Sequence, residues 1–318
     1  MFLPLVRRLV SMLTTLFGVL VVVFIILRLL PGNAVTASLG VNAGLLSHAQ
    51  LQAIDKFYGV GESIPQQFFS WLWSMLHGNL GISLSSREPV STLIGSALPV
   101  TLELAVMSMV LGILIGVGFG MIGALHPDRW QDDVGQGLAV FGLSVPSFVI
   151  GTVLITYLAS IFHYFPSSLG FVGLFTNPWL NLQQVFFPAL TLSFGIGAAI
   201  MRTTRAAVLE IRGLNFARTA RGKGISRLAY VWRHLFLNAL VAITTMSGIQ
   251  FGYLLGGAVI VEDIFVLPGI GRLLITSITD RDFPVVQSVT LIFAAGFIVV
   301  NTLIDISYTL IDPRTRRR

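Results

Sequence analysis

The densest group of basic side chains in this sequence lies in one short stretch, ARTARGKGISRLAYVWRHLFLNAL, at residues 217–240. Its basic residues are Arg218, Arg221, Lys223, Arg227, Arg233 and His234, and it contains no acidic residue. A lysine between glycines could suggest a phosphate-binding loop, but that loop requires Ser or Thr after the lysine, and Gly224 stands there. We therefore expect no nucleotide site here, and the basic charge needs another explanation.

Other residues that could carry out chemistry are absent or scattered. The chain has no cysteine, which excludes disulfides, thiolate metal sites and a cysteine nucleophile. Neither an H-E-x-x-H nor a G-x-S-x-G motif occurs, and the five histidines lack the spacing of paired ligands; they are His48, His77, His126, His163 and His234. We expect no catalytic residue, no metal site and no cofactor in this chain.

The composition is that of a membrane protein. The chain is 54% hydrophobic and 11% charged, with a mean hydropathy of +0.84, which lies far outside the range of soluble domains. Six apolar stretches are long enough to be transmembrane helices, at residues 9–30, 98–125, 134–162, 186–201, 239–261 and 285–311. The fourth is short, and we expect it to end at Arg202. The predicted fold class is an all-α membrane protein with six transmembrane helices.

The distribution of Lys and Arg predicts the orientation, because positive charge near span ends is retained in the cytoplasm. With the N-terminus inside, the inner segments hold Arg7, Arg8, Arg129, the run from Arg202 to Arg233, and Arg314, Arg316, Arg317 and Arg318. The outer segments hold only Lys56, Arg87, Arg272 and Arg281, with Arg28 near a boundary. Both termini are therefore predicted to be cytoplasmic.

The basic stretch falls in the inner loop 202–238, between the fourth and fifth spans. Apolar residues recur there at spacings of three or four, as in helices with one apolar face; they are Ile211, Leu214, Ala217 and Ala220, then Ile225, Leu228, Trp232 and Leu235. Glycine at 222–224 can end the first helix, and Ser226 is placed to cap the second. We expect two short amphipathic helices suited to a groove of a soluble partner. The alternative is that the charge only sets topology.

The loop resembles the EAA loop of permease subunits in binding-protein-dependent ABC importers, in the form found in the dipeptide, oligopeptide and nickel permease family. The similarity covers nearly the whole chain, because further segments follow the family pattern in order: RLLPGN, HGNLGISLSSREPV, LPVTLELA, GLSVPSFVIG, FPALTLSFGIGAAIMRTTRAAVLE and VEDIFVLPGIGRLLITSITDRDFPVVQSVTLIFAAGFIVVNTLIDISYTLIDPRTR. Two positions depart from the pattern, since Gly222 replaces the usual Ala and Asn33 a common Asp.

The resemblance implies a type I ABC importer permease fold in a bacterial or archaeal cytoplasmic membrane. The residues that it assigns to coupling with an ATPase are Arg218, Thr219, Ala220, Arg221, Gly222, Lys223 and Gly224. The partners that it implies are a second homologous permease, two cytoplasmic ATP-binding subunits, an extracytoplasmic solute-binding protein and membrane lipid, without nucleic acid. ATP and Mg²⁺ are then bound by the ATPases, and this chain is not an enzyme.

Other positions are weaker candidates for function. Glu103, Pro146 and Asp305 could line a translocation pathway, although interfacial or packing roles are the alternative. The binding protein could dock on Trp71, Trp73, Arg272, Asp280, Arg281 and Asp282, or the tryptophans could belong to a helix at the membrane surface. Gly112, Gly116, Gly118 and Gly120 are expected to allow close helix packing.

The expected organisation is an N-terminal helix and extracytoplasmic segment at 1–97, a five-helix core at 98–311 that contains the coupling loop, and a basic tail at 312–318. The expected function is uptake of di- or oligopeptides delivered by the binding protein. Nickel complexes, glutathione or another small solute are alternatives within the same class. An ion-coupled secondary transporter would need carboxylates near mid-membrane, and a membrane scaffold that does not transport is the other alternative.

Overall fold

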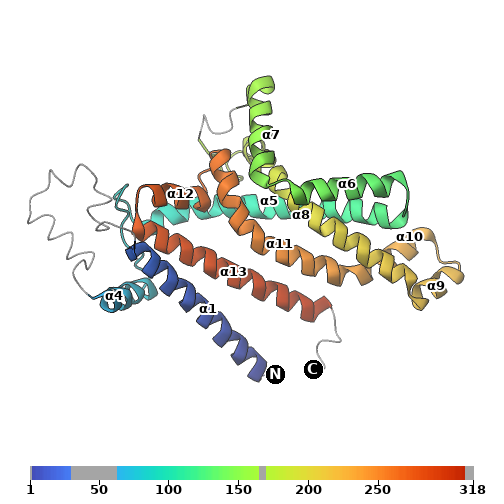
Figure 1. Ribbon diagram of the computed structural model, residues 1–318, viewed down its shortest axis with the longest axis horizontal. Helices are drawn as coiled ribbons and strands as arrows, with labels where there is room; N and C mark the ends of the chain where they lie inside the picture. Colours follow the sequence, from blue (N-terminus) through green and yellow to red (C-terminus); the bar gives the residue numbers. More distant parts are fainter. Residues whose placement is uncertain (1, 30–62, 165–169, 312–318) are drawn as a thin grey trace, which may run out of the picture. The chain divides into compact units, whose positions relative to one another are not determined.

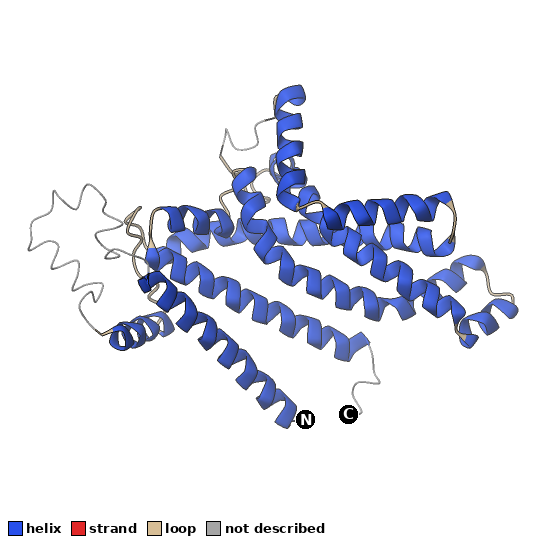
Figure 2. Ribbon diagram, viewed as in Figure 1, coloured by secondary structure: helices blue, strands red, loops and turns tan. Residues whose placement is uncertain are grey.

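The computed structural model describes residues 2–29, 63–164 and 170–311, although the side chains of parts of the first and last helices are outside the description. Within these residues the regular structure is helical, apart from one isolated bridge between Ile82 and Pro89 (Figure 2). The predicted all-α class is confirmed. The predicted basic tail at 312–318 lies outside the described residues.

Helices occupy all six predicted spans (Figure 1). They are α1 (Phe2–Leu29), α5 (Val90–Leu125), the pair α6 (Trp130–Ser144) and α7 (Ser147–Phe162), α8 (Pro178–Gly213), α11 (Leu237–Ile264) and α13 (Phe283–Ile311). Among the described residues, 4 helical segments are long and apolar enough to cross a membrane, and the α6–α7 pair makes up to 5. The apolar segment described in α1, Thr14–Ile26, is shorter than a full span.

The third predicted span is a broken helix. The axes of α6 and α7 differ by 100° across a break at Val145 and Pro146. Val145 is extended, with φ −89° and ψ 121°, because a residue before proline avoids the helical region. Proline also lacks the N–H that would continue the helix, so the chain changes direction sharply at Pro146.

The fourth span is longer than predicted. We expected it to end at Arg202, but α8 continues to Gly213 and contains 36 residues, about 54 Å at 1.5 Å per residue. Asn177 caps its start by accepting a hydrogen bond from the Leu180 N–H at 3.1 Å, and Pro178 occupies the first turn. Arg202 does not end the helix, because charge alone breaks no backbone hydrogen bond and neither proline nor glycine occurs between Arg202 and Gly213.

The chain divides into two compact units. One joins the described residues up to Pro99 with Pro268–Ile298, and the other joins Val100–Leu267 with the chain from Val299 onward. The sequence-based division placed 268–298 in the five-helix core. The structure groups it with the N-terminal segment instead, because an apolar cluster joins the start of α5 to α12 (Ile270–Thr279) and α13; its buried members are Val90, Ile94, Ala97, Ile270, Val285 and Val289.

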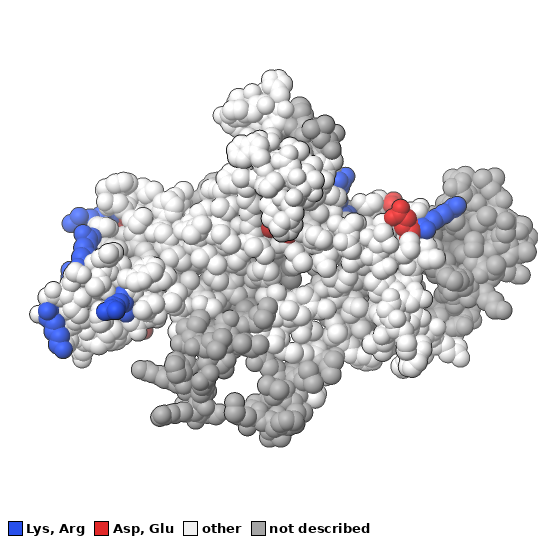
Figure 3. All heavy atoms as spheres, turned by 180° about the vertical axis from the view of Figure 1, so that it is seen from behind, with Lys and Arg blue, Asp and Glu red and all other residues white. Residues whose placement is uncertain are grey.

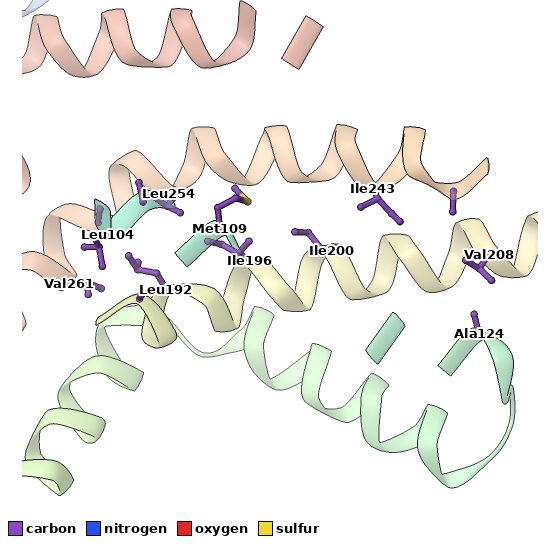
Figure 4. Packing of buried hydrophobic residues seen from close by; sticks show 14 of the residues in the cluster. Leu104, Met109, Ala124, Leu192, Ile196, Ile200, Val208, Ile243, Leu254 and Val261 are labelled. Carbon is purple, nitrogen blue, oxygen red and sulfur yellow. The ribbon is translucent and has the colours of Figure 1, made fainter. Parts of the chain in front are cut away.

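Helix α8 is the central element of the second unit. Its residues Ile196, Ile200 and Val208 are buried in an apolar core that also contains Leu104 of α5 and Ile243 of α11 (Figure 4). This core continues along α8 past Arg202, which explains why the helix stays packed beyond its most apolar part.

Glycines bring α5 into direct contact with α8. A Cβ atom added to Gly112 would lie 2.6 Å from Ile196 Cγ2, one on Gly116 2.7 Å from the Gly197 carbonyl oxygen, and one on Gly120 2.8 Å from the Met201 carbonyl oxygen. These glycines recur every four residues and therefore share one face of α5. The predicted packing role is confirmed for them, whereas Gly118 would meet nothing within 4 Å.

Helix α6 approaches another part of α8 in the same way. A Cβ on Gly142 would lie 2.9 Å from Ala198 Cβ and 3.0 Å from the Phe194 carbonyl oxygen. Between Gly142 and Gly135, Ala139 packs in a small cluster with Ala198 and Met201 of α8. Glycines at the α5–α8 and α6–α8 contacts let the backbones of these three helices lie close together. Such close approach is how transmembrane helices gain packing energy.

We expect Gly116→Leu to separate α5 from α8 and to lower the thermal midpoint of the purified protein. The added side chain would overlap the α8 backbone, and overpacking of this kind costs about 1–3 kcal/mol or more. Gly118→Leu is the matched control, because it makes the same change on an exposed face of the same helix. Thermal unfolding in detergent, followed by size-exclusion chromatography, measures both variants. Equal midpoints would contradict the packing assigned to Gly116.

Candidate functional site

The basic stretch forms a short helix and a turn between α8 and α11. Helix α8 ends at Gly213, α9 covers Asn215–Gly222, and α10 covers Arg227–Ala229. A π-helical segment, Tyr230–Phe236, then continues directly into α11. The first predicted amphipathic helix is therefore present, but the second is the beginning of α11 and not a separate element.

The turn between α9 and α10 depends on a left-handed glycine. Gly224 has φ +73°, a conformation that costs little only for glycine, whereas Gly222 still belongs to α9. Ser226 then caps α10, since its hydroxyl oxygen accepts a hydrogen bond from the Ala229 N–H at 3.4 Å. The predicted cap is confirmed, and the left-handed position is Gly224.

The inner face of this segment belongs to the core of the second unit. Ala217 and Ala220 of α9 are buried together with Tyr230 and Leu235 of the π-helical segment. The Arg221 guanidinium lies over the Tyr230 ring, 5.8 Å from its centroid, in a cation–π arrangement. These contacts hold α9 against the start of α11, so the turn between them is presented on a fixed base.

The outer face combines positive charge with exposed apolar side chains. Arg218, Thr219, Gly222, Lys223 and Gly224 are exposed, and Lys and Arg side chains gather at this end of the unit, on the left of Figure 3. Leu228 is 79% exposed and Trp232 is 59% exposed. Of the apolar stripe predicted for the second helix, Leu235 is buried, whereas Leu228 and Trp232 remain exposed.

Three arginines connect this segment to the α5–α6 connection. Arg205 of α8 makes a two-pronged ion pair with Asp132 of α6, at 2.5 Å from Nε to Oδ1 and 2.6 Å from Nη2 to Oδ2. Arg212 donates to the carbonyl oxygen of Ala124 at the end of α5, and Arg227 Nη2 lies 3.4 Å from His126 Nε2. The C-terminal part of α8 and the start of α10 are thereby tied to the end of α5, the turn that follows it and the start of α6.

Sequence reasoning missed this arginine set and one buried carboxylate. Glu262 of α11 is fully buried, and one of its oxygens accepts a hydrogen bond from the Thr101 hydroxyl of α5 at 2.6 Å. A signal was present for the arginines, because Arg205 and Arg212 interrupt an otherwise helical apolar period at a spacing of seven and so share one face. Nothing in the sequence indicates that their partners lie near residues 124–132.

The weaker pathway candidates occupy different environments. Glu103 is partly buried and has the Asn181 side chain as a hydrogen-bond partner. Pro146 is exposed at the α6–α7 break. Asp305 belongs to α13, but its side chain is not among those described. A role of these residues in lining a pathway stays a prediction.

The candidate docking residues all belong to the first unit. Trp71 packs on Phe24 of α1, with ring centroids 5.6 Å apart, whereas Trp73 is 67% exposed. Arg272 of α12 is partly buried, and Asp280 and Arg281 are exposed after its end. Trp71 therefore has a packing partner within the unit. A role of these positions in docking stays a prediction.

Asp282 is buried, unlike the exposed docking candidates. Its side chain is 1% exposed, and its Oδ2 accepts hydrogen bonds from the Ser83 hydroxyl at 2.5 Å, the Ser85 hydroxyl at 2.9 Å and the Ser85 N–H at 3.2 Å. The carboxylate thus holds the 83–85 turn against the start of α13. These contacts give Asp282 a structural role, and its part in docking stays a prediction.

Solved structures with a similar fold include two membrane transporters. One, described as an amino acid ABC transporter with histidines, aligns with a TM-score of 0.51 at 18% identity and covers 69% of this chain and 94% of its own. The other, described as inward-facing conformations of the MetNI methionine ABC transporter, gives a TM-score of 0.54 at 17% identity and covers 71% and 99%. At these identities the likeness establishes the fold alone.

Curated relatives match along almost the entire chain. The glutathione transport system permease protein GsiC of Pectobacterium atrosepticum is 36% identical over 311 residues, and that of Escherichia coli strain K12 is 35% identical over 312 residues; each match covers 98% of both chains. Residues 109–317 match the family described as binding-protein-dependent transport system inner membrane component, and residues 1–105 match its N-terminal companion. This multi-pass chain therefore belongs to the inner-membrane components of binding-protein-dependent transport systems, as a permease subunit of an ABC importer.

Proposed function

We propose that this permease forms, with a second homologous permease, the pathway by which short peptides enter the cell, and that α9, α10 and the turn between them couple it to cytoplasmic ATPases. The observation that carries the coupling role is the outer surface of this segment. Exposed apolar side chains, Leu228 and Trp232, lie beside exposed basic ones on a base that is buried in the core. Large apolar side chains exposed to water beside basic ones mark a surface that another protein covers.

The chemistry of this surface defines its partner. Large apolar anchors such as Trp232 gain most when they enter a closely fitting pocket. Arg218 and Lys223 beside them favour acidic residues at the rim, which speed association more than they add affinity. The partner is therefore an ATP-binding subunit with an apolar cleft and an acidic rim, seated on the turn that contains Gly224.

The orientation that supports this proposal comes from the charge distribution. Positive charge near span ends stays in the cytoplasm, and the loop with Arg218, Arg221 and Lys223 is the most basic part of the chain. The N- and C-termini are assigned to the same side. The loops that contain Trp73, Asp280 and Arg281 then face the other side, where a solute-binding protein docks.

Energy for transport is assigned to the partners. The sequence has no phosphate-binding loop pattern, so ATP and Mg²⁺ are assigned to two ATPase subunits, and this chain itself carries no cofactor. Binding and hydrolysis there move the α9–α10 surface, and the helices attached to it alternate between outward and inward access. An ion-coupled carrier would not need this surface.

Peptide is the substrate class that the relatives favour. Both curated relatives described above are named as permeases of glutathione transport systems, and glutathione is itself a small peptide. We assign di- or oligopeptides, glutathione included, to this importer. Nickel complexes and other small solutes remain the alternative, because specificity in such systems resides mainly in the binding protein.

Purification of the intact complex tests the coupling surface. We expect Trp232→Glu to reduce the recovery of ATPase subunits about tenfold, because a charge in place of a buried anchor costs roughly 1.4 kcal/mol or more. Trp179→Glu is the matched control, since Trp179 is an exposed tryptophan at the start of α8. Mass spectrometry of the material that co-purifies from native membranes gives the amounts. Absence of ATPases with the unchanged protein would overturn the proposed function.

Substitution of the two turn glycines separates turn conformation from available space. Neither glycine has an atom within 4 Å of an added Cβ, but only Gly224 has a positive φ. We expect Gly224→Ala to strain the turn by about 1–2 kcal/mol and to lower ATP-driven uptake several-fold, with the thermal midpoint lowered by only a few degrees. Gly222→Ala should leave uptake unchanged. Equal uptake by the two variants, measured in proteoliposomes, would contradict a coupling role for the turn.

Ligand identification tests the substrate class. The binding protein that co-purifies should bind glutathione or di- and tripeptides. Uptake of the radiolabelled ligand by the complex in proteoliposomes should require ATP on the side of the membrane that carries the ATPases. Calorimetric titration of the purified binding protein measures the affinity. If the binding protein binds nickel complexes and no peptide, the substrate assignment is wrong, whereas the coupling proposal is unaffected.

A further inference from the structure

We propose that the ion pair of Asp132 and Arg205 is the link that transmits movement of the ATPase-facing segment to α6, with the break at Pro146 as the pivot. This inference rests on the proposed function. It assigns a positioning role to two residues outside the surface that contacts the ATPase, and it makes α6 and α8 move as one body.

The ion pair is built into the packing between helices. Asp132 is 1% exposed, and Arg205 reaches it with two nitrogen atoms at 2.5 Å and 2.6 Å. Both carboxylate oxygens are therefore used by one planar guanidinium, a geometry that fixes direction as well as distance. The Asp128 N–H adds a hydrogen bond to Oδ2 at 3.3 Å, so the carboxylate is held from two sides.

The neighbouring helix leaves space for this pair. A Cβ on Gly123 of α5 would lie 2.9 Å from Asp132 Oδ1 and 3.8 Å from Arg205 Cδ. A side chain at 123 would thus push against the carboxylate. One residue further along, Ala124 is buried beside Val208 of α8 (Figure 4). The end of α5, the start of α6 and the extension of α8 therefore meet at the ion pair.

The other two arginine contacts lead from this point to the surface. Arg212 binds the Ala124 carbonyl oxygen seven residues further along α8, and Arg227 of α10 lies against His126. The His126 Nδ1 is 3.2 Å from the Ile122 carbonyl oxygen, which favours the tautomer with a proton on Nδ1 and leaves Nε2 to accept from Arg227. The contacts become more exposed toward α10, so the buried pair is the firm attachment of the series.

The break at Pro146 determines what moves with this attachment. Helix α6 packs along α8 through Gly135, Ala139 and Gly142 and is tied to it by the ion pair. At Val145 and Pro146 the chain turns by 100° into α7. The proline nitrogen has no hydrogen to donate, so it forms no backbone hydrogen bond across the break. A displacement of α8 will therefore carry α6 with it. Helix α7 also packs on α8, since a Cβ on Gly151 would lie 3.3 Å from Thr191 Cγ2, but rotation at Val145 lets its angle to α6 change.

The test separates a link from a merely structural contact. Arg205→Gln leaves Asp132 buried without its charge partner and destabilises the protein. Asp132→Asn leaves Arg205 unpaired, but its side chain is 24% exposed, so the cost is smaller. The paired variant Asp132→Leu/Arg205→Met removes both charges, and such replacements often restore stability. A structural contact predicts that the paired variant regains transport. A link predicts that it folds and assembles but remains uncoupled.

The measurement is the amount of substrate taken up per ATP hydrolysed by the complete reconstituted complex, together with its thermal midpoint. We expect the paired variant to hydrolyse ATP at near the normal rate and to transport at least about fivefold less per ATP, at the lower end of typical coupling between sites. Arg205→Lys keeps the charge but loses the two-pronged geometry. Its uptake per ATP should lie between that of the unchanged protein and that of the paired variant. Asp133→Asn, on the exposed side of the same turn, is the matched control.

Normal uptake per ATP in the paired variant would overturn the link, while the proposed function would stand. A loss of assembly in all four ion-pair variants, with unchanged uptake per assembled complex, would also overturn it and reduce the ion pair to a packing element. If the unchanged complex neither recruits ATPases nor hydrolyses ATP, the proposed function fails first and the link fails with it.

Discussion

The close approach of α5 and α6 to α8 is the constraint on which the second unit depends. Glycines at 112, 116 and 120 on α5, and at 135 and 142 on α6, leave room for the α8 backbone. Helices in lipid gain little from excluding water, so their association relies on such contacts. Because both neighbours fit against one long helix, α8 has a defined position over its whole length, including the part that leaves the most apolar region.

This packing also explains how charged side chains are accommodated. A buried carboxylate is costly unless it is paired and hydrogen-bonded. Asp132 meets both conditions, because Gly123 leaves space beside it and α8 places Arg205 in reach. The arginines of α8 therefore contribute to helix packing as well as to membrane topology. The excess of positive charge that predicts the orientation in the sequence also provides the bonds that fix the α9–α10 surface.

The sequence predicted the features that depend on local chemistry. Hydropathy located six helical regions, the glycines of α5 indicated close helix packing except at Gly118, and Ser226 was identified as a cap. Features that depend on distant partners were missed. The end of α8 follows from partners of Arg205 and Arg212 that lie near residues 124–132, and Asp282 is buried because the 83–85 turn folds over it. Neither contact leaves a local pattern.

The apolar residues Leu228 and Trp232 show where prediction of the candidate site from the sequence ends. Their helical spacing predicts an apolar face but does not determine whether the same chain or another covers it. In this chain Leu235 turns inward and the other two turn outward. The outward pair lies beside basic residues that no acidic residue of the same stretch neutralises. The interface that we propose for another protein would satisfy both features at once, and the ion pair at Asp132 ties α8, which leads into it, to α6.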